Sequence, residues 1–188
     1  MAAWSGSFPV RWHGLSILVQ PDDQRVRGWQ RISDDAERIF VSRTGETRDH
    51  VIVECPGVQI RPAGAGDAGA VAMLAAELAQ SFAFSRPRFD LSFPDVLAAP
   101  DSCLLVAADG SDGCQGYLLG FRHLTLYANG PVGWVEEVLV RREHRGRGVG
   151  RALMGAFERW VAGRGCVLVA LATRRAAPFY RALGYQAR

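Results

Sequence analysis

From residue 58 onward, apolar side chains recur at the spacings that are typical of strands and helices. Residues 58–61 alternate as a short strand, and a helix begins near Asp67 and repeats its apolar positions every three or four residues. A second, shorter helical piece ends before Pro100, and Pro87 is expected to break the aromatic stretch in front of it. The pattern therefore predicts one strand followed by two helices.

The second half of the chain alternates strands with turns and then with helices. The predicted strands are residues 103–108, 117–126, 134–140 and 167–171. A long helix begins at 148–151, and a short helix near the end is stopped by Gly184. The run at 167–171 is apolar throughout, as in a strand buried on both faces. This order predicts an α/β fold of the mixed-sheet (α+β) kind, with helices on both faces of a central sheet.

Residues 1–57 show a different pattern, which contains no long periodic helix. Short strands are suggested at 15–19, 38–41 and 51–53, and the rest is turn-like and charged. We therefore expect a poorly ordered N-terminal extension at 1–57 and a folded domain at 58–188.

Composition indicates an ordinary enzyme domain. With 188 residues and 48% hydrophobic content, the chain can bury one substantial core. The net charge of +3 is too mild for a long nucleic-acid track. The sequence shows neither a bilayer-spanning apolar run nor a secretory signal, so we expect a cytoplasmic protein that binds neither membrane nor nucleic acid.

Cysteine and histidine spacing gives no sign of a metal site. The four cysteines, at positions 55, 103, 114 and 166, include no C-x-x-C pair, and the four histidines are scattered. We expect free thiols, no zinc and no other metal.

A basic, glycine-rich turn at residues 141–151 joins a predicted strand to a predicted helix. Gly146, Gly148 and Gly150 remove the side chains that would keep an anion away from the amides of the first helical turn, and the helix dipole adds attraction. The turn therefore predicts a phosphate site. It does not fit a Walker loop, which needs Gly, four residues and then Gly-Lys-Ser/Thr, and it does not fit the dinucleotide fingerprint G-x-G-x-x-G, because residue 151 is arginine where the third glycine is needed.

Two motifs resemble those of one known family. Arg145-x-x-Gly148-x-Gly150 resembles the acyl-CoA pyrophosphate loop of the GNAT family of N-acetyltransferases. The segment 176–185, which contains Tyr180, resembles the last helix of the same family. The motifs follow one another in the family's order, and the resemblance covers the chain from about residue 58. It implies the GNAT-like acyl-CoA N-acyltransferase fold and acetyl-CoA as co-substrate.

The resemblance also implies how acetyl-CoA is held, chiefly by backbone amides of the loop and by the strand in front of it. The implied cofactor-binding positions are Val138, Leu139, Val140, Arg145, Gly146, Arg147, Gly148, Val149, Gly150 and Arg151. Arg142 and Arg147 are further candidates for the 3′-phosphate. Tyr180 is implied to be the general acid on the leaving thiolate.

Two adjacent carboxylates interrupt the apolar strand before the loop. Strand alternation places Glu136 on the face of Val138 and Val140, and Glu137 on the face of Leu139. The resemblance implies a catalytic pair, in which we expect Glu136 to be the main base and Glu137 to contact the amine; the alternative is two solvent-facing charges. An alkylammonium pKa lies about 6 units above that of an ordinary glutamate, so we expect Glu136→Gln to slow turnover without abolishing it.

The acceptor is indicated only by charge. Two carboxylates favour a cationic primary amine of a small molecule, acetylated directly in a ternary complex. Three alternatives remain open, namely a protein amine as acceptor, an acyl-CoA-binding module without turnover and, ranked last, an Arg/Gly segment that binds nucleic acid. The candidates for a pocket wall, which are equally typical of a core, are Phe82, Phe84, Phe89, Phe93 and Tyr127.

The C-terminal end is short for this family. Three residues follow Tyr185, whereas the family fold closes with a further strand. We expect the domain to lack that strand. A neighbouring copy in a homodimer or the N-terminal segment could supply a substitute, and without one the sheet edge is unprotected.

Overall fold

A computed structural model describes residues 9–12, 15–18, 38–43, 57–79, 83–110 and 113–187. Its strands are β1 (Pro9–Trp12), β2 (Leu15–Leu18), β3 (Arg38–Arg43), β4 (Val58–Pro62), β5 (Ser102–Asp109), β6 (Cys114–Thr125), β7 (Gly130–Val140), β8 (Leu168–Thr173) and β9 (Gln186–Ala187). Its α-helices are α1 (Ala68–Leu78), α2 (Arg86–Ala98), α3 (Val149–Ala162) and α4 (Ala177–Ala182), and short 3₁₀ turns lie at Ala65–Asp67 and Arg142–His144. From β4 to α4, the order of strands and α-helices confirms the order predicted from the sequence.

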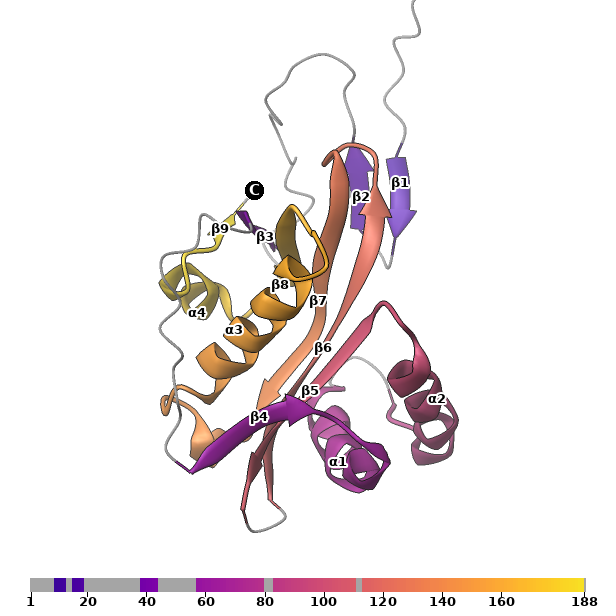
Figure 1. The fold of residues 1–188 in the computed structure, drawn as a ribbon, viewed down its shortest axis with the longest axis vertical. Coiled ribbons are helices and arrows are strands. Elements are labelled where there is room, and N and C mark those ends of the chain that lie inside the picture. The colour runs from indigo at the N-terminus through magenta and orange to yellow at the C-terminus, as the bar shows by residue number, and fades with distance from the viewer. Residues whose placement is uncertain are drawn as a thin grey trace, which may run out of the picture.

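Seven of the described strands form one sheet, in the order β4-β5-β6-β7-β8-β3-β9 (Figure 1). Strands β4 to β7 are antiparallel neighbours, β7 and β8 are parallel, and β3 runs antiparallel to β8. The described strands β1 and β2 form a separate antiparallel pair. The predicted mixed sheet is therefore confirmed.

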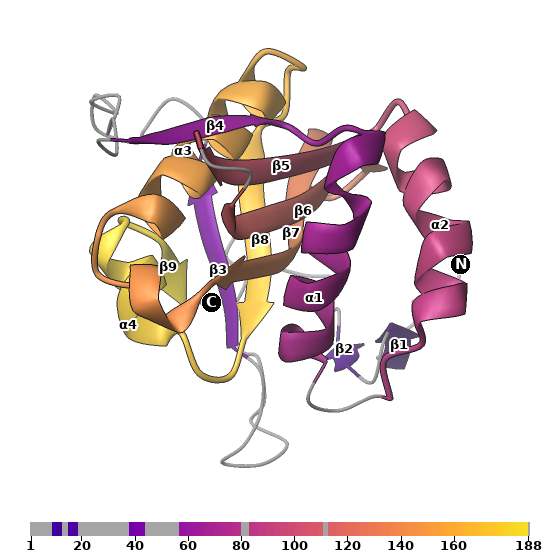
Figure 2. The same ribbon diagram turned by 90° about the horizontal axis from the view of Figure 1, so that it is seen from below.

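Helices cover both faces of the sheet. Figure 2 shows α1 and α2 on one side and α3 and α4 on the other. The α3 side holds a core that includes Leu153, Phe157 and Val135, whereas the α1 side holds a core that includes Leu74 and Tyr117. The sheet thus separates two apolar layers, and a side chain on β7 belongs to one layer or the other.

Helix α2 differs from its sequence prediction. Pro87 does not break it but lies in its first turn, where a missing N–H costs no hydrogen bond. Pro94 lies inside the same helix. Pro94 and Asp90 are both exposed, so water can satisfy the Asp90 carbonyl that loses its intrahelical donor.

The N-terminal segment contributes one strand to the main sheet. All six residues of β3 pair with β8, and Phe40 and Val41 also pair with β9. The structure therefore places Arg38–Arg43, which lies within the predicted extension, in the main sheet. The two-residue β9 after Tyr185 is paired with that strand rather than missing. The strand suggested at 51–53 lies outside the described residues, and the division at residue 57 stays a prediction.

We expect Phe40→Ala to lower the free energy of unfolding by about 3–5 kcal/mol, because the mutation leaves a cavity at a fully buried aromatic position. Phe40 has 0% exposure, and its ring centroid lies 6.0 Å from that of Tyr180. Denaturant unfolding measures the change, and Val41→Ala, at a half-buried neighbouring position, is the control. If the two variants lost the same small amount, β3 would not be part of the cooperative core.

Cys103, Cys114 and Cys166 are thiols that form no disulfide among the described residues, as predicted, and the structure shows that all three are buried; Cys55 lies outside the described residues. Burial raises the pKa of the Cys103 thiol to about 12. Within the described part of the chain, no helix has both the length and the apolar character needed to cross a bilayer.

Candidate active site

The predicted phosphate loop leads into an uncapped helix. Gly148 is the N-cap of α3 and has a φ of 89°, and Gly146 has a φ of 75°. Both angles lie in the left-handed region, which glycine adopts without a steric penalty. Among the described residues, no side chain donates or accepts a capping hydrogen bond at this end. The first amides of α3 are therefore oriented for an anion.

The loop and the last-helix motif are in contact. A side chain on Gly150 would place its Cβ 3.1 Å from the Phe179 ring, so the glycine lets α4 pack closely against α3 without displacement of that ring. Arg151 donates to the Ala182 carbonyl at 3.5 Å. The two motifs that indicated the family thus form one structural unit.

Strand β7 has an edge that pairs with β8 over only part of its length. The parallel pairing covers Val132–Val135 of β7 and Leu168–Leu171 of β8, and among the described residues β7 has no strand partner on this side beyond Val135. Residues 136–140 pair with β6 on their other side. Backbone groups on this side can hydrogen-bond an extended ligand, except the Val140 carbonyl, which already accepts from Arg145. The cofactor positions Val138, Leu139 and Val140 lie in this stretch.

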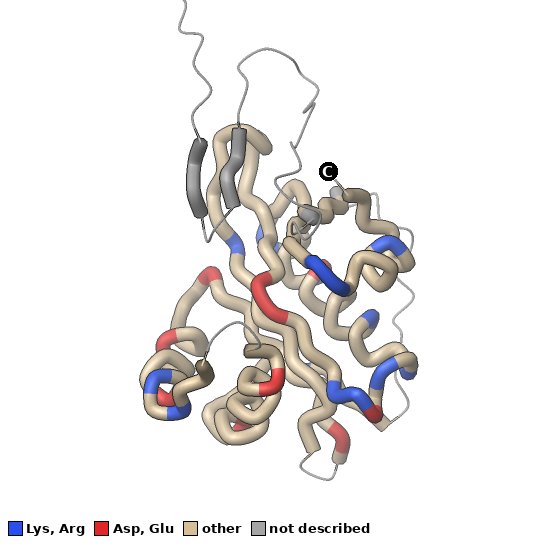
Figure 3. Tube along the Cα trace, turned by 180° about the vertical axis from the view of Figure 1, so that it is seen from behind, with Lys and Arg blue, Asp and Glu red and all other residues tan. Residues whose placement is uncertain are grey.

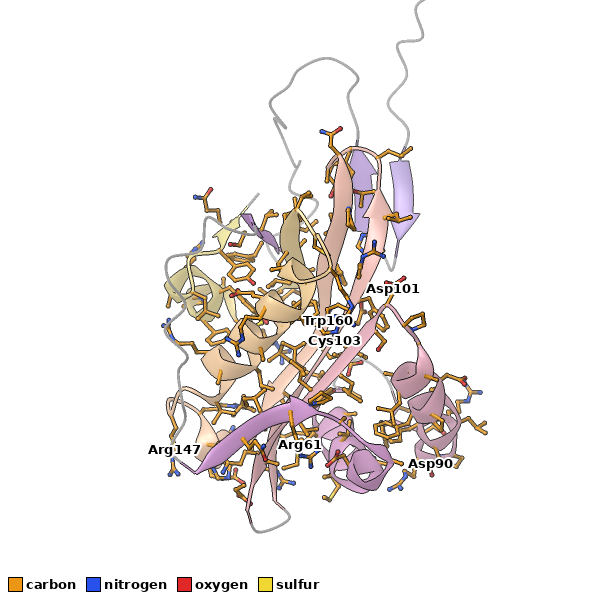
Figure 4. The ribbon with its side chains drawn as sticks, viewed as in Figure 1. Arg61, Asp90, Asp101, Cys103, Arg147 and Trp160 are labelled. Atoms are coloured by element: carbon orange, nitrogen blue, oxygen red, sulfur yellow. The ribbon has the colours of Figure 1, made fainter. Side chains whose placement is uncertain are left out.

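Arginines surround the loop but differ in what they contact. The Arg145 side chain donates from Nε to the Val140 carbonyl at 2.9 Å and lies 3.7 Å from the Glu77 carboxylate on α1. Arg142 and Arg147 are exposed, and Figure 4 shows Arg147 at the edge of the molecule. Arg145 therefore ties the loop to β7 and α1, while Arg142 and Arg147 are exposed beside the loop.

A β-bulge shifts the alternation of β7 at the acidic pair. Leu119 of β6 pairs with Glu137, but the next residue pairs with Val135, so Glu136 is the extra residue. Beyond the bulge, Val138 packs in the α3-side core. Figure 3 shows the acidic stretch midway along a mostly uncharged sheet.

The bulge places both carboxylates on the α1 face of the sheet. Val135 faces α3, so Trp134 and Glu136 alternate to the opposite face, and Trp134 Nε1 donates to Glu136 Oε2 at 3.0 Å. Glu137 also faces α1, because Tyr117 of the α1-side core donates to it. The predicted separation onto two faces is wrong. A regular period of two does not hold across an inserted residue.

Glu137 is the partly buried member of the pair, and Glu136 is exposed. The Tyr117 hydroxyl donates to Glu137 Oε2 at 2.6 Å. Burial raises the pKa of Glu137, the Tyr117 hydrogen bond opposes this increase and the Glu136 charge adds to it. A carboxyl with a raised pKa is better suited to taking a proton from an amine than an exposed one.

Sequence reasoning did not find Tyr117. In an apolar strand, a tyrosine is expected to be core, and Tyr117 is indeed only 1% exposed. The register of the β6–β7 pair would have indicated its role, because Tyr117 pairs with Leu139, two positions from Glu137 on the same face.

Tyr180 lies in the α3-side core with 7% exposure. Its ring contacts Phe40, Phe179 and Tyr185, with centroids 6.0, 5.0 and 6.0 Å away. Burial raises the pKa of the Tyr180 hydroxyl to about 12, so the group stays protonated at neutral pH.

The aromatic residues considered for a pocket wall do not gather in one place. Phe84, Phe89 and Phe93 form a row with centroid spacings of 5.8 and 5.2 Å, and Phe93 is buried in the α1-side core. Tyr127 lies at the turn between β6 and β7 with 78% exposure. Phe82 lies outside the described residues.

A family model described as the acetyltransferase (GNAT) family matches residues 71–185. The chain belongs to the GNAT acetyltransferase family. The match spans the phosphate loop, the acidic strand and the last-helix motif, so it confirms the resemblance seen in the sequence. The protein is an N-acetyltransferase of the class that uses an acyl-CoA donor.

Solved structures share the fold of this GNAT acetyltransferase. A transcriptional regulator from Bacillus halodurans is 25% identical with a TM-score of 0.63, covering 69% of this chain and 93% of that one. The aminoglycoside N-acetyltransferase AAC(6')-Iy, bound to a bisubstrate analogue, is 21% identical with a TM-score of 0.62, covering 69% and 90%.

Glucosamine-6-phosphate N-acetyltransferase from Arabidopsis thaliana is 19% identical with a TM-score of 0.62, covering 70% of this chain and 92% of that one. At these low identities, the likeness to the two N-acetyltransferases establishes the fold and leaves the acceptor open. Among curated protein sequences, none matches the chain significantly.

Proposed function

We propose that this GNAT acetyltransferase moves the acetyl group of acetyl-CoA directly to a primary amine of a small molecule, with both substrates bound together. The proposal is carried by the arrangement of residues 136–151. There, a partly buried carboxylate, a strand edge without a strand partner and an uncapped helix N-terminus follow one another in a single strand, loop and helix.

The donor site is proposed at the start of α3. The amides of Val149 and Gly150 would bind the diphosphate, and the free edge at residues 138–140 would pair with the pantetheine arm. Arg142 and Arg147, which are exposed beside the loop, would meet the 3′-phosphate. The helix dipole and the arginines both favour a polyphosphate.

Glu137 is proposed as the base, with Glu136 in contact with the cationic acceptor. This reverses the order expected from the sequence, because Glu137 is the partly buried carboxyl and has the raised pKa. With ordinary pKa values, taking a proton from an alkylammonium is uphill by about 6 units, or about 8 kcal/mol. The raised Glu137 pKa reduces this difference. Alignment of the amine with the activated thioester can supply about 7–11 kcal/mol of the barrier reduction.

Tyr180 is proposed to act on the leaving sulfur as a hydrogen-bond donor. A thiol such as that of CoA has a pKa near 8.5, whereas the Tyr180 hydroxyl has a pKa of about 12. Full proton transfer to the thiolate would therefore be uphill by roughly 3–4 units, or about 5 kcal/mol. A hydrogen bond that strengthens as charge develops on the sulfur avoids this cost.

We expect Tyr180→Phe to lower kcat about tenfold, because the loss of one such hydrogen bond costs about 1.4 kcal/mol in the transition state. Steady-state kinetics with saturating acetyl-CoA would measure the change. A decrease in kcat of three orders of magnitude would instead mean that the Tyr180 hydroxyl transfers its proton to the sulfur. An unchanged kcat would mean that Tyr180 takes no part in the reaction.

The pair of carboxylates on one face supports a cationic acceptor. The direct test incubates the purified chain with acetyl-CoA and a panel of small primary amines, including a diamine, an amino sugar and an aminoglycoside. Thiol release and the mass of the acetylated amine are both measured. Turnover of lysine peptides alone would favour a protein acceptor. Tight acetyl-CoA binding without turnover of any amine would favour a sensing module.

A further inference from the structure

A buried tyrosine on the strand next to β7 forms a short hydrogen bond to the proposed base. Tyr117 lies on β6, is 1% exposed and donates its hydroxyl hydrogen to Glu137 Oε2 at 2.6 Å. A neutral donor at this distance from a carboxylate makes a strong, charge-assisted hydrogen bond. The contact fixes one of the two carboxylate oxygens.

The sheet sets the geometry of this contact. Tyr117 pairs with Leu139 and Leu119 pairs with Glu137, so Tyr117 reaches Glu137 diagonally across the antiparallel pair. The bulge at Glu136 increases the local twist where this diagonal begins. The tyrosine ring is packed in the core with Leu74 and Phe93, and it has little freedom to move.

We propose that Tyr117 is a positioning residue for the acetyl transfer: its hydroxyl holds Oε2 of Glu137, so that Oε1 is left to accept the proton of the acceptor amine. This inference rests on the proposed function of Glu137. Tyr117 does not touch substrate in this scheme and acts through the carboxylate.

Few other titratable groups face Glu137 in the described structure. Glu136 on β7 adds negative charge, and Tyr117 is the group from β6 that bonds to it. Helices α1 and α2 contribute apolar side chains to this core, namely Val71, Leu74 and Phe93. Without the Tyr117 hydroxyl, burial and the Glu136 charge remain as the main influences on the pKa of Glu137. Both disfavour the ionised carboxylate, so both raise that pKa.

The test is Tyr117→Phe, which keeps the ring and removes the hydroxyl. The acid limb of the kcat/KM profile should move to higher pH by about one unit, because a hydrogen bond to a charged group contributes about 1.5 kcal/mol. When Tyr117→Phe is added to the Glu137→Gln variant, the pH profile of kcat/KM should not change further, because the carboxyl that titrates is already absent. If the acid limb of the Tyr117→Phe profile stayed at the wild-type pH, the inference about Tyr117 would be overturned. The proposed function would still stand, because it is tested separately by the turnover of the wild-type enzyme.

Carbon-13 NMR titration of the Glu137 carboxyl gives a readout that does not depend on turnover. It should show the same upward shift in Tyr117→Phe, and an unshifted titration would overturn the inference even if no amine were acetylated. Tyr185→Phe is the matched control. Tyr185 also donates to a buried glutamate, Glu158, at 2.6 Å, but in the other core. Tyr185→Phe should lower the free energy of unfolding and leave the pKa measured for Glu137 unchanged.

Discussion

Replacement of Gly148 with glutamate should weaken acetyl-CoA binding by at least about 100-fold and abolish turnover. The new carboxylate would lie at the N-terminus of α3, where the diphosphate is proposed to bind. Two like charges about 4 Å apart repel by about 4 kcal/mol at an effective dielectric of 20, which corresponds to roughly a thousandfold in affinity. Calorimetric titration with acetyl-CoA measures the loss directly.

A left-handed glycine at the other end of the same helix provides the control. Gly165 has a φ of 71°, and a side chain there would meet nothing within 4 Å. Gly165→Glu therefore imposes the same backbone strain and adds the same charge away from the loop. It should bind acetyl-CoA like the wild type. Equal weakening in the two variants would point to destabilisation, and full binding by Gly148→Glu would place the donor elsewhere.

The second large effect is expected from Glu137→Gln, which should lower kcat by about 100-fold and leave acetyl-CoA affinity unchanged. General base catalysis typically contributes 10²–10⁴-fold, and glutamine cannot take a proton. The raised Glu137 pKa moves the acid limb of the kcat/KM profile to higher pH than an ordinary glutamate would give, so wild-type activity rises with pH through that pKa. The variant should show no such limb in a pH series of steady-state rates.

The same raised pKa predicts the effect on stability. A carboxyl whose pKa is higher in the folded state than in the unfolded state loses folding free energy as the pH rises through the folded pKa. At neutral pH, Glu137→Gln should therefore be at least as stable as the wild type, and low activity would not reflect unfolding. Glu136→Gln, at the exposed neighbour, should slow turnover by only a few-fold. If Glu136→Gln lost more turnover than Glu137→Gln, Glu136 would be the base.

Sequence reasoning was most accurate where one local pattern decides the structure. The amphipathic spacing of α3 and the glycines before it predicted the loop and the first helical turn, and Gly184 predicted the left-handed stop after α4. These features depend on neighbouring residues in the chain. The family resemblance rested on the same two segments, which the structure brings into contact through Gly150 and Phe179.

Features that depend on pairing between distant strands were harder to predict. The orientation of Glu136 depends on a bulge, and a bulge is defined by the register of β7 against β6 rather than by the sequence of β7. Tyr117 could not be assigned to Glu137 without that register. The position of β3 between β8 and β9 similarly depends on contacts far along the chain.

The place of β3 in the sheet has a consequence for synthesis on the ribosome. Its residues pair with β8 more than 120 positions later in the chain. At about 5–20 residues per second, that strand waits on the order of 6–25 s before its partner has been translated. Such a high separation between paired residues slows folding and leaves a strand edge open meanwhile. The nascent chain of this acetyltransferase is therefore expected to complete its sheet only after β8 has been translated, with chaperones as the natural protection of the waiting segment.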